Sequence, residues 1–326
     1  MTPASPAQNA PEASAELTSN HEQALLRKGE QLRESVQILQ RRDHRFFLTM
    51  AILAAITVFL GFFPTYFQKP LEPLLPLPPS PKLATLLLIH GAVMTAYILF
   101  YVLQTAMAGT GRRALHMTLG WASVVFIPAI SILGTMAVIQ SAKLGHKQIW
   151  PDLETNAIIN IFDVLVFAIL STAAILLRAM PETHKRLMLL ALIAGVLPAA
   201  IARSPVIRLG PAAVGAVVIA FLLAGPFYDL LTRRRIHRAS VWGLLFVVCT
   251  MPPTRLAIGR TQASHRFVDW VIRSERLQIA SSNVFCKLAR SNCKCALGHF
   301  RPLSSSALRN SDAVLADPKP AGSTSL

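Results

Sequence analysis

The stretch LATLLLIHGAVMTAYILFYVLQTAMAG, residues 83–109, decides the fold class. It is long enough to cross a bilayer, which takes about 20 apolar residues, yet it contains His90, Tyr97, Tyr101 and Gln104. A polar group without a partner in hydrocarbon costs several kcal/mol, so these side chains require partners from other helices. The stretch therefore predicts one helix of a membrane-embedded bundle.

The spacing of the polar residues places them on one side of that helix. His90, Met94, Tyr97, Tyr101 and Gln104 follow one another at intervals of four, three, four and three residues, which collects them on a single helical face. The opposite face is almost entirely apolar. One side of the helix is therefore expected to face lipid, and the other side a bundle interior or a cavity.

The composition is that of a membrane protein with several spans. Of 326 residues, 53% are hydrophobic and 15% are charged, and the mean hydropathy is +0.47. The net charge of +16 would suggest nucleic acid in a soluble chain, but most Lys and Arg residues lie between apolar segments, where membrane topology explains them. We therefore expect contact with the lipid bilayer and no nucleic-acid partner.

Seven apolar segments are predicted to span the membrane. The fifth and the seventh are the weakest, because the fifth contains Pro198 and the seventh closes on Pro252 and Pro253. The chain is therefore predicted to be an all-α helix bundle over residues 46–256, with about seven transmembrane helices. The segments cover about residues 46–66, 83–108, 119–140, 157–178, 187–204, 212–232 and 239–256.

The flanking segments differ from the bundle in composition. Residues 1–20 are rich in Ala, Pro, Ser and Glu and are predicted to be disordered, whereas residues 21–45 are predicted to form a basic amphipathic helix on the membrane surface. Residues 257–326 are predicted to be an irregular tail. Three cysteines in that tail, spaced by seven and two residues, match neither a zinc ribbon nor a redox pair: Cys286, Cys293 and Cys295.

The Lys and Arg residues predict the orientation in the membrane. The N-terminal segment and the loops after the second, fourth and sixth spans carry 15 of them, and the alternate loops carry six. Positive residues near span ends are retained in the cytoplasm. The N-terminus is therefore expected inside the cell and, with seven spans, the C-terminus outside.

Four motifs resemble an uncharacterised family of bacterial multi-pass inner-membrane proteins. The motifs are LIHG (residues 88–91), GRRALH (111–116), HKRLM (184–188) and YDLLTRRRIH (228–237), and the likeness extends over roughly residues 44–272. The resemblance implies a location in the bacterial cytoplasmic membrane and implies no reaction. Where the family's pattern has Arg after the Leu-His pair, this chain has Met117.

A polar site is predicted inside the bundle. His90 and Asp163 each lie about seven residues into a span from the same side, which is about 10 Å. Asn160 lies one turn above Asp163, and Arg203 and Arg255 approach from the ends of the fifth and seventh spans. A carboxylate at this depth should be paired or protonated. A contact between His90 and Asp163 is therefore predicted, either as the centre of a small-solute or proton-coupled carrier or as a packing contact.

Three histidines are predicted at the cytoplasmic level of the bundle: His116, His184 and His237, with Asp229 at the same level. Two imidazoles on different helices can hold haem b as axial ligands, and the arrangement loosely resembles the transmembrane b-type cytochromes. Each histidine also lies beside Arg or Lys, as do residues that anchor helix ends among lipid headgroups. These residues are therefore candidate haem ligands or interfacial anchors, and no metal site is predicted.

The sequence leaves three classes of function open. The first is a haem-binding or redox-linked membrane protein, the second is a carrier centred on His90 and Asp163, and the third is a non-catalytic structural or assembly protein. The sequence has no Gly-rich phosphate loop, nucleophile elbow or helical zinc motif, so no enzymatic activity is assigned.

Overall fold

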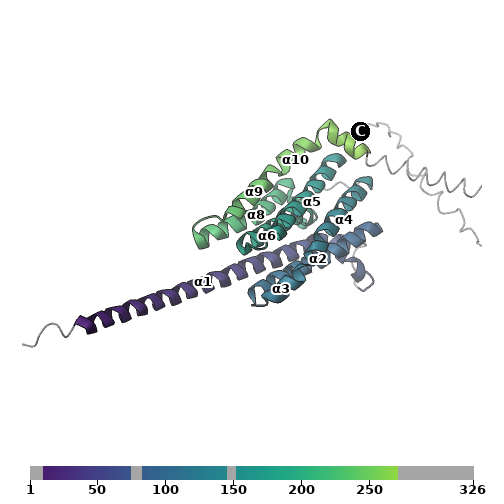
Figure 1. Cartoon of the computed structure of the whole chain (residues 1–326). Coiled ribbons are helices and arrows are strands. Elements are labelled where there is room, and N and C mark those ends of the chain that lie inside the picture. The colour runs from purple at the N-terminus through teal and green to yellow at the C-terminus, as the bar shows by residue number, and fades with distance from the viewer. Residues whose placement is uncertain (1–9, 75–82, 145–151, 271–326) are drawn as a thin grey trace, which may run out of the picture. The chain divides into compact units, whose positions relative to one another are not determined.

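The part of the protein that the structure describes is built from helices. The computed structural model describes residues 10–74, 83–144 and 152–270, and every regular element in these ranges is a helix (Figure 1). The elements are α1 (Ala10–Phe62), the π-helical turn η1 (Phe63–Phe67), the 3-10 turn η2 (Lys69–Leu71), α2 (Thr85–Gly109), α3 (Arg113–Gly120), α4 (Ser123–Lys143), α5 (Leu153–Leu176), α6 (Pro181–Gly195), α7 (Leu197–Ile201), the 3-10 turn η3 (Pro205–Leu209), α8 (Pro211–Arg233), α9 (Arg238–Cys249) and α10 (Pro252–Gly259).

Seven helical segments of the described chain are long and apolar enough to cross a membrane, which confirms the predicted class of fold. The fifth segment combines α6 with α7, and the seventh combines α9 with α10. The cytoplasmic location of the N-terminus stays a prediction from the loop charges. The segments are Leu25–Phe67, Thr85–Gly109, Ser123–Lys143, Leu153–Leu176, Pro181–Ile201, Pro211–Arg233 and Arg238–Gly259.

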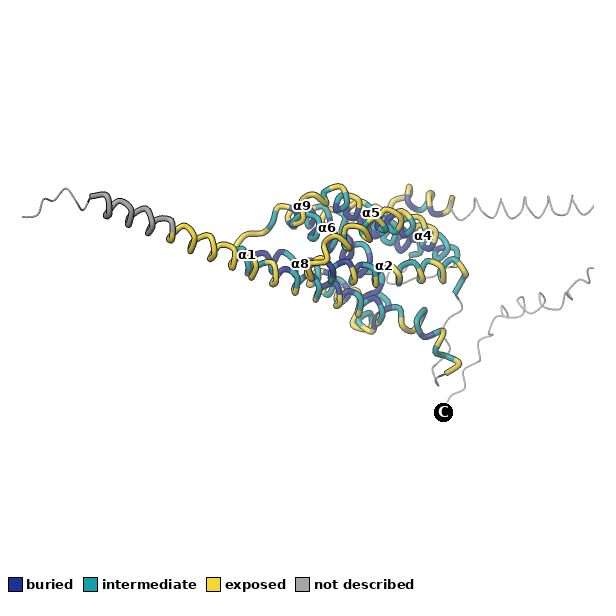
Figure 2. The backbone as a smooth tube through the Cα atoms, turned by 60° about the horizontal axis from the view of Figure 1, so that its bottom comes forward, coloured by how far each residue is buried: buried dark blue, intermediate teal, exposed yellow. Residues whose placement is uncertain are grey.

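The outer surface of the bundle is apolar. Ile56 on α1, Ile132 on α4 and Leu223 on α8 are 48%, 60% and 49% exposed, and many other large aliphatic side chains also face outward. Figure 2 shows buried backbone between the helices and exposed backbone on their outer sides. A surface of this kind aggregates in water, whereas lipid tails solvate it. The described helices therefore form an integral membrane protein.

Helix α6 is the most buried of the spans. Every residue from Leu189 to Ala194 is buried, and 67% of its span is enclosed by protein, the largest share among the seven. Helix α5 packs along it, and α1, α8 and α9 also contact it. A helix that is apolar on all sides is expected at the centre of a bundle. The span that is weak in the sequence is therefore the central one.

Prolines interrupt the fifth and seventh spans, as their positions predict. Helix α6 ends at Gly195, and α7 begins at Leu197, directly before Pro198. Helix α9 ends at Cys249, and α10 begins at Pro252. In both spans the chain continues as a helix after the interruption.

The N-terminal segment differs from the prediction. Helix α1 runs unbroken from Ala10 to Phe62, so residues 10–20 are helical rather than disordered, and residues 21–45 are continuous with the first span rather than a separate surface helix. No proline follows Pro11 until Pro64, and good helix formers fill the interval. The side chains described from Leu25 to Arg42 are exposed with the exception of Leu39 (Figure 2).

The segment after the seventh span also differs from the prediction. Residues 262–270 are helical rather than irregular, and Val268 is buried against Ala142 of α4 and Ala157 of α5. This apolar contact explains why the chain keeps its helical form beyond α10. The three cysteines of the predicted tail lie outside the described residues.

The helices define two ends of the bundle. At the charged end, α2, α5 and α8 finish and α6 and α9 begin, with Asp43 of α1 beside them. At the far end, α1, α7 and α10 finish and α2 and α5 begin. Two close approaches there involve Gly61 with Ala200, and Gly259 with Thr155.

The contact of α1 with α7 depends on a glycine. A Cβ atom at Gly61 would lie 2.1 Å from the carbonyl oxygen of Ala200, which is backbone and cannot rotate away. Gly61→Ala is therefore expected to lower the free energy of unfolding by about 1–3 kcal/mol, the usual cost of overpacking. Thermal unfolding in detergent measures this loss.

Gly215 in α8 supplies the matched control, because a Cβ there meets nothing within 4 Å. Gly215→Ala is expected to be neutral or to stabilise the helix by up to about 1 kcal/mol. Equal losses in the two variants would show that α1 does not approach α7 as described.

Candidate functional site

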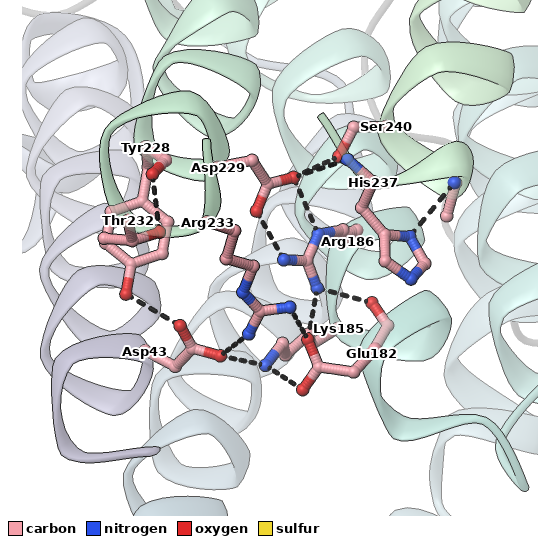
Figure 3. A network of polar contacts seen from close by, with 11 residues as sticks. Asp43, Glu182, Lys185, Arg186, Tyr228, Asp229, Thr232, Arg233, His237 and Ser240 are labelled. Carbon is pink, nitrogen blue, oxygen red and sulfur yellow. Dashed lines mark hydrogen bonds and ion pairs between the residues drawn. The ribbon is translucent and has the colours of Figure 1, made fainter. Parts of the chain in front are cut away.

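The charged end contains a buried ion pair between α6 and α8. The Nε of Arg186 donates to Oδ2 of Asp229 at 3.0 Å, and its Nη2 donates to Oδ1. The guanidinium therefore binds the carboxylate with two parallel hydrogen bonds (Figure 3). The two side chains are 4% and 1% exposed. Ser240 Oγ and the backbone N–H of His237 donate to the same carboxylate, at 3.1 and 3.3 Å. Asp229 therefore joins α6, α8 and the start of α9.

A second carboxylate brings α1 into the same network. Oδ2 of Asp43 accepts from Lys185 Nζ and from Arg233 Nη2, each at 2.5 Å, and its Oδ1 accepts from the Tyr228 hydroxyl at 2.7 Å. Glu182 connects the two halves, since it accepts bonds from three cations at 2.6–2.8 Å (Figure 3). The three cations are Lys185, Arg186 and Arg233.

The network is balanced in charge. It holds three carboxylates and three cations, which between them form every ion pair of the group. Such an arrangement stabilises helix positions and leaves no net charge to attract a ligand. An open pocket of about 370 Å³ lies beside it, lined by Val36, Leu39, Gln40, Asp43, Glu182, Arg233 and Arg235.

Sequence reasoning named only Asp229 among these carboxylates. The role of Glu182 could have been predicted, because its spacing to Lys185 and Arg186 places all three residues on one side of a helix start. The role of Asp43 could not have been predicted, since it lies in a run of arginines that is typical of a cytoplasmic segment next to a membrane span.

His116 is tied to α2. Its Nδ1 lies 3.1 Å from the backbone carbonyl of Gln104. When the Gln104 amide is oriented so that its oxygen accepts from Gly120 N–H at 3.2 Å, its nitrogen donates to Nδ1 of His116 at 2.6 Å and to the His116 carbonyl at 3.1 Å. Gln104, one of the polar residues of the opening stretch, thus holds α3 against α2. This orientation leaves the ring proton of His116 on Nε2.

The other two histidines also make backbone contacts. Nδ1 of His184 lies 2.8 Å from the carbonyl of Ala174, so it carries the ring proton and donates it. Nδ1 of His237 accepts from Ala239 N–H at 3.1 Å and caps α9. Burial lowers the pKa of His237 below its ordinary value, and the Arg186 guanidinium acts in the same direction, so the ring is neutral near pH 7. His184 alone of the three therefore combines a donating Nδ1 with an Nε2 lone pair suited to a metal.

At the far end, Asp163 of α5 pairs with Arg255 of α10 and not with His90. Arg255 Nη1 donates to Oδ1 of Asp163, and the two side chains are 5% and 7% exposed. No hydrogen bond or ion pair joins His90 to Asp163 in the described residues. The predicted contact between them is therefore wrong, because equal depth along two helices does not fix which way each side chain points.

The interruption before Pro252 positions Arg255. In an unbroken helix the carbonyl of Thr250 would accept from Thr254 N–H, but that N–H bonds to Met251 instead. The freed carbonyl of Thr250 accepts from Arg255 Nε. The guanidinium therefore closes the helix break with one edge and reaches Asp163 with the other.

Several buried polar groups of α2 and α5 lack hydrogen-bond partners. They are Nδ1 of His90 and the hydroxyls of Tyr97 and Ser171, together with the hydroxyl of Thr155 in the first turn of α5. The Tyr97 and Ser171 hydroxyls are neighbours, and the Tyr97 ring packs edge-on against Phe167 at 5.4 Å between centroids. Buried polar groups are nearly always satisfied, so Nδ1 of His90 marks a place where a polar guest or water belongs, beside the facing Tyr97 and Ser171 hydroxyls, which lie close enough to pair with each other.

The remaining residues of the predicted polar site contact their own helix. The amide nitrogen of Asn160 donates to the carbonyl of Asn156 at 2.7 Å in its own helix. Tyr101 is buried, with its ring centroid 6.3 Å from that of Tyr97. Within the described residues, no group of three His, Cys, Asp or Glu side chains is arranged to hold a metal ion.

The fold and its polar sites define a multi-pass membrane protein with a charge-balanced end and an unsatisfied interior. No family model, curated protein or solved structure matches the chain.

The pair of Asp163 with Arg255 has a measurable signature. Either Asp163→Ala or Arg255→Ala leaves one buried charge alone, which is expected to cost about 3–5 kcal/mol of the free energy of unfolding. The double variant should lose clearly less than the sum of the two single losses, because no unpaired charge is left. Unfolding experiments in detergent on all four proteins give the coupling.

His90→Ala provides the control. Combined with Asp163→Ala, its effect on stability is expected to be additive, since no hydrogen bond or ion pair joins the two side chains in the described chain. Coupling between His90 and Asp163, with none between Asp163 and Arg255, would contradict the arrangement described.

Proposed function

We propose that this integral membrane protein binds a small polar solute inside the bundle, beside His90, and acts as its carrier. The observation that supports this proposal is the set of unsatisfied polar atoms on α2 and α5. His90 and Tyr97 lie two helical turns apart on α2, about 10 Å along the axis. Ser171 of α5 lies beside Tyr97. A polar solute or water beside His90 satisfies its free ring nitrogen, and the Tyr97 and Ser171 hydroxyls continue the polar path further along the same helices.

The cost of leaving such groups empty favours this interpretation over packing alone. An unsatisfied buried polar group costs about 1–3 kcal/mol. A helix interface that served only for packing would be expected to carry aliphatic side chains at these positions. Intramembrane polar residues instead mark solute and proton pathways in membrane proteins.

The site is separate from the charge-balanced network. Asp163 is already neutralised by Arg255, so it serves to position α10 and does not carry the site. Of the two residues predicted as the carrier centre, the proposal therefore retains His90 as a contact for the solute. Proton coupling would depend on the same His90 ring, which has a free nitrogen.

Water access to Ser171 tests the proposal. In a variant whose native cysteines are replaced by serine, Ser171→Cys is expected to react with a water-soluble methanethiosulfonate reagent, because thiol reaction requires the thiolate and therefore water. The reaction is measured by the mass increase of the protein in lipid vesicles.

Leu223→Cys is the control, because this position is 49% exposed on the outer, apolar side of α8 and should meet lipid. It is expected to stay unlabelled under the same conditions. An unreactive Ser171→Cys variant beside a reactive Leu223→Cys variant would overturn the proposal.

Haem b is a second candidate, favoured by one observation. His116 and His184 are close enough to interact electrostatically, and His184 donates its Nδ1 proton to a backbone carbonyl, which is the usual setting of a histidine ligand. At His116 the situation is reversed. The Gln104 amide donates to Nδ1, so the ring proton lies on Nε2, the nitrogen that would have to bind the haem iron. Haem ligation ranks below solute binding for this reason, and the likeness to the bacterial inner-membrane family favours neither.

An absorption spectrum separates the two candidates. Protein purified after expression with added haem precursor is expected to show no Soret band. A band that disappears in His184→Ala and persists in His237→Ala would instead establish haem ligation at the charged end.

A further inference from the structure

Arg203 lies at the far end of the bundle, in the turn between α7 and η3. Its Nη1 donates to the carbonyl of Ala199 at 2.8 Å, and its guanidinium carbon lies 5.0 Å from the centroid of the Phe62 ring. No carboxylate of the described chain forms an ion pair with it. The two fully buried arginines of the described chain both pair with an acid, Arg186 with Asp229 and Arg255 with Asp163.

Arg203 is partly buried, and even partial burial of a cation is unfavourable without an anion. Burial lowers the pKa of Arg203 to about 10, and no neighbouring acid offsets that effect. A cation in a weakly solvated site is normally matched by an opposite charge. The phenyl ring of Phe62 offers only a weak substitute.

His90 lies at the same end of the bundle, within electrostatic range of Arg203. The His90 ring and the Arg203 guanidinium interact electrostatically, and Nδ1 of His90 is enclosed without a hydrogen-bond partner. The Arg203 side chain thus offers N–H donors from the turn after α7, and His90 a ring nitrogen from α2. Two independent features, a missing anion and a missing hydrogen bond, therefore occur within electrostatic range of each other at the far end of the bundle.

We propose that Arg203 and His90 bind an oxyanion, the carboxylate or phosphate group of a ligand, at the far end of the bundle. The planar guanidinium of arginine matches two oxygens of such a group with two parallel bonds. The neutral His90 ring donates a further bond when its proton lies on Nδ1. The inference deepens the proposed function, because it rests on the solute site beside His90 and names the class of its ligand.

The oxyanion can belong to a soluble ligand or to a lipid headgroup, and the two sources are separated by the probe. The purified full-length protein in an uncharged detergent is titrated with inorganic phosphate, with acetate, and with phosphatidylglycerol in mixed micelles. Sodium chloride of equal ionic strength and phosphatidylcholine are the reference additions. The melting temperature is recorded at each step, because a ligand that binds the folded state raises it.

The wild-type protein is expected to be stabilised by at least one of the three probes beyond its reference addition. Stabilisation by phosphate or acetate identifies a soluble ligand, and stabilisation by phosphatidylglycerol alone identifies a lipid. Arg203→Gln should abolish the response and, without any probe, should melt at a higher temperature than the wild type, because it removes an uncompensated charge. Arg208→Gln, which removes an exposed arginine of η3, should respond as the wild type does.

Arg203→Lys covers the case in which Arg203→Gln does not fold. It keeps the charge but loses the paired donors, and its apparent affinity is expected to fall roughly tenfold or more, as the loss of one charge-assisted hydrogen bond implies. No stabilisation of the wild type by any probe overturns the inference, as does an equal response in the wild type and the Arg203 variants. A labelled Ser171→Cys variant without an oxyanion response would reject the ligand class and leave the proposed function standing.

Discussion

The two parallel hydrogen bonds between Arg186 and Asp229 join the most buried helix of the bundle to α8 at a depth where neither charge is tolerated alone. Breaking a buried pair by removing one partner typically costs about 3–5 kcal/mol. The same carboxylate also accepts from the start of α9. One residue of α8 thus fixes the beginnings of two neighbouring helices, and the packing of α5, α1 and α8 around α6 follows from that position.

The position of α6 shows that a weakly hydropathic span can be a central one. The span Pro181–Ile201 has a hydropathy of 1.5, against 2.5 for the first span, yet it is the most enclosed of the seven spans of the described chain. Small residues and charges are tolerated where neighbouring helices supply contacts. The number of spans and most of their positions were therefore predictable from the sequence, but hydropathy alone could not tell the enclosed fifth span from the seventh, which has the same value of 1.5 and is only 19% buried.

For the polar sites, the sequence predicted how deep each residue lies along its helix, but not which residues meet. His90, Asp163 and Arg255 all lie where the spacing places them, but the rotation of each helix and the break before Pro252 decide which side chains meet. The histidines show a second limit. The ring protons of His116 and His184 are assigned by hydrogen bonds to an amide and a carbonyl group of other helices, and nothing in a linear sequence carries that information.

The unbroken course of α1 has a mechanical consequence. Fifty-three helical residues at 1.5 Å each make a rod of about 80 Å, and it contains no proline between Pro11 and Phe62. Asp43 lies on this rod, where it holds Lys185 and Arg233. A force or a binding partner that turned the exposed segment before Arg42 would transmit its torque to those ion pairs without a joint to absorb it.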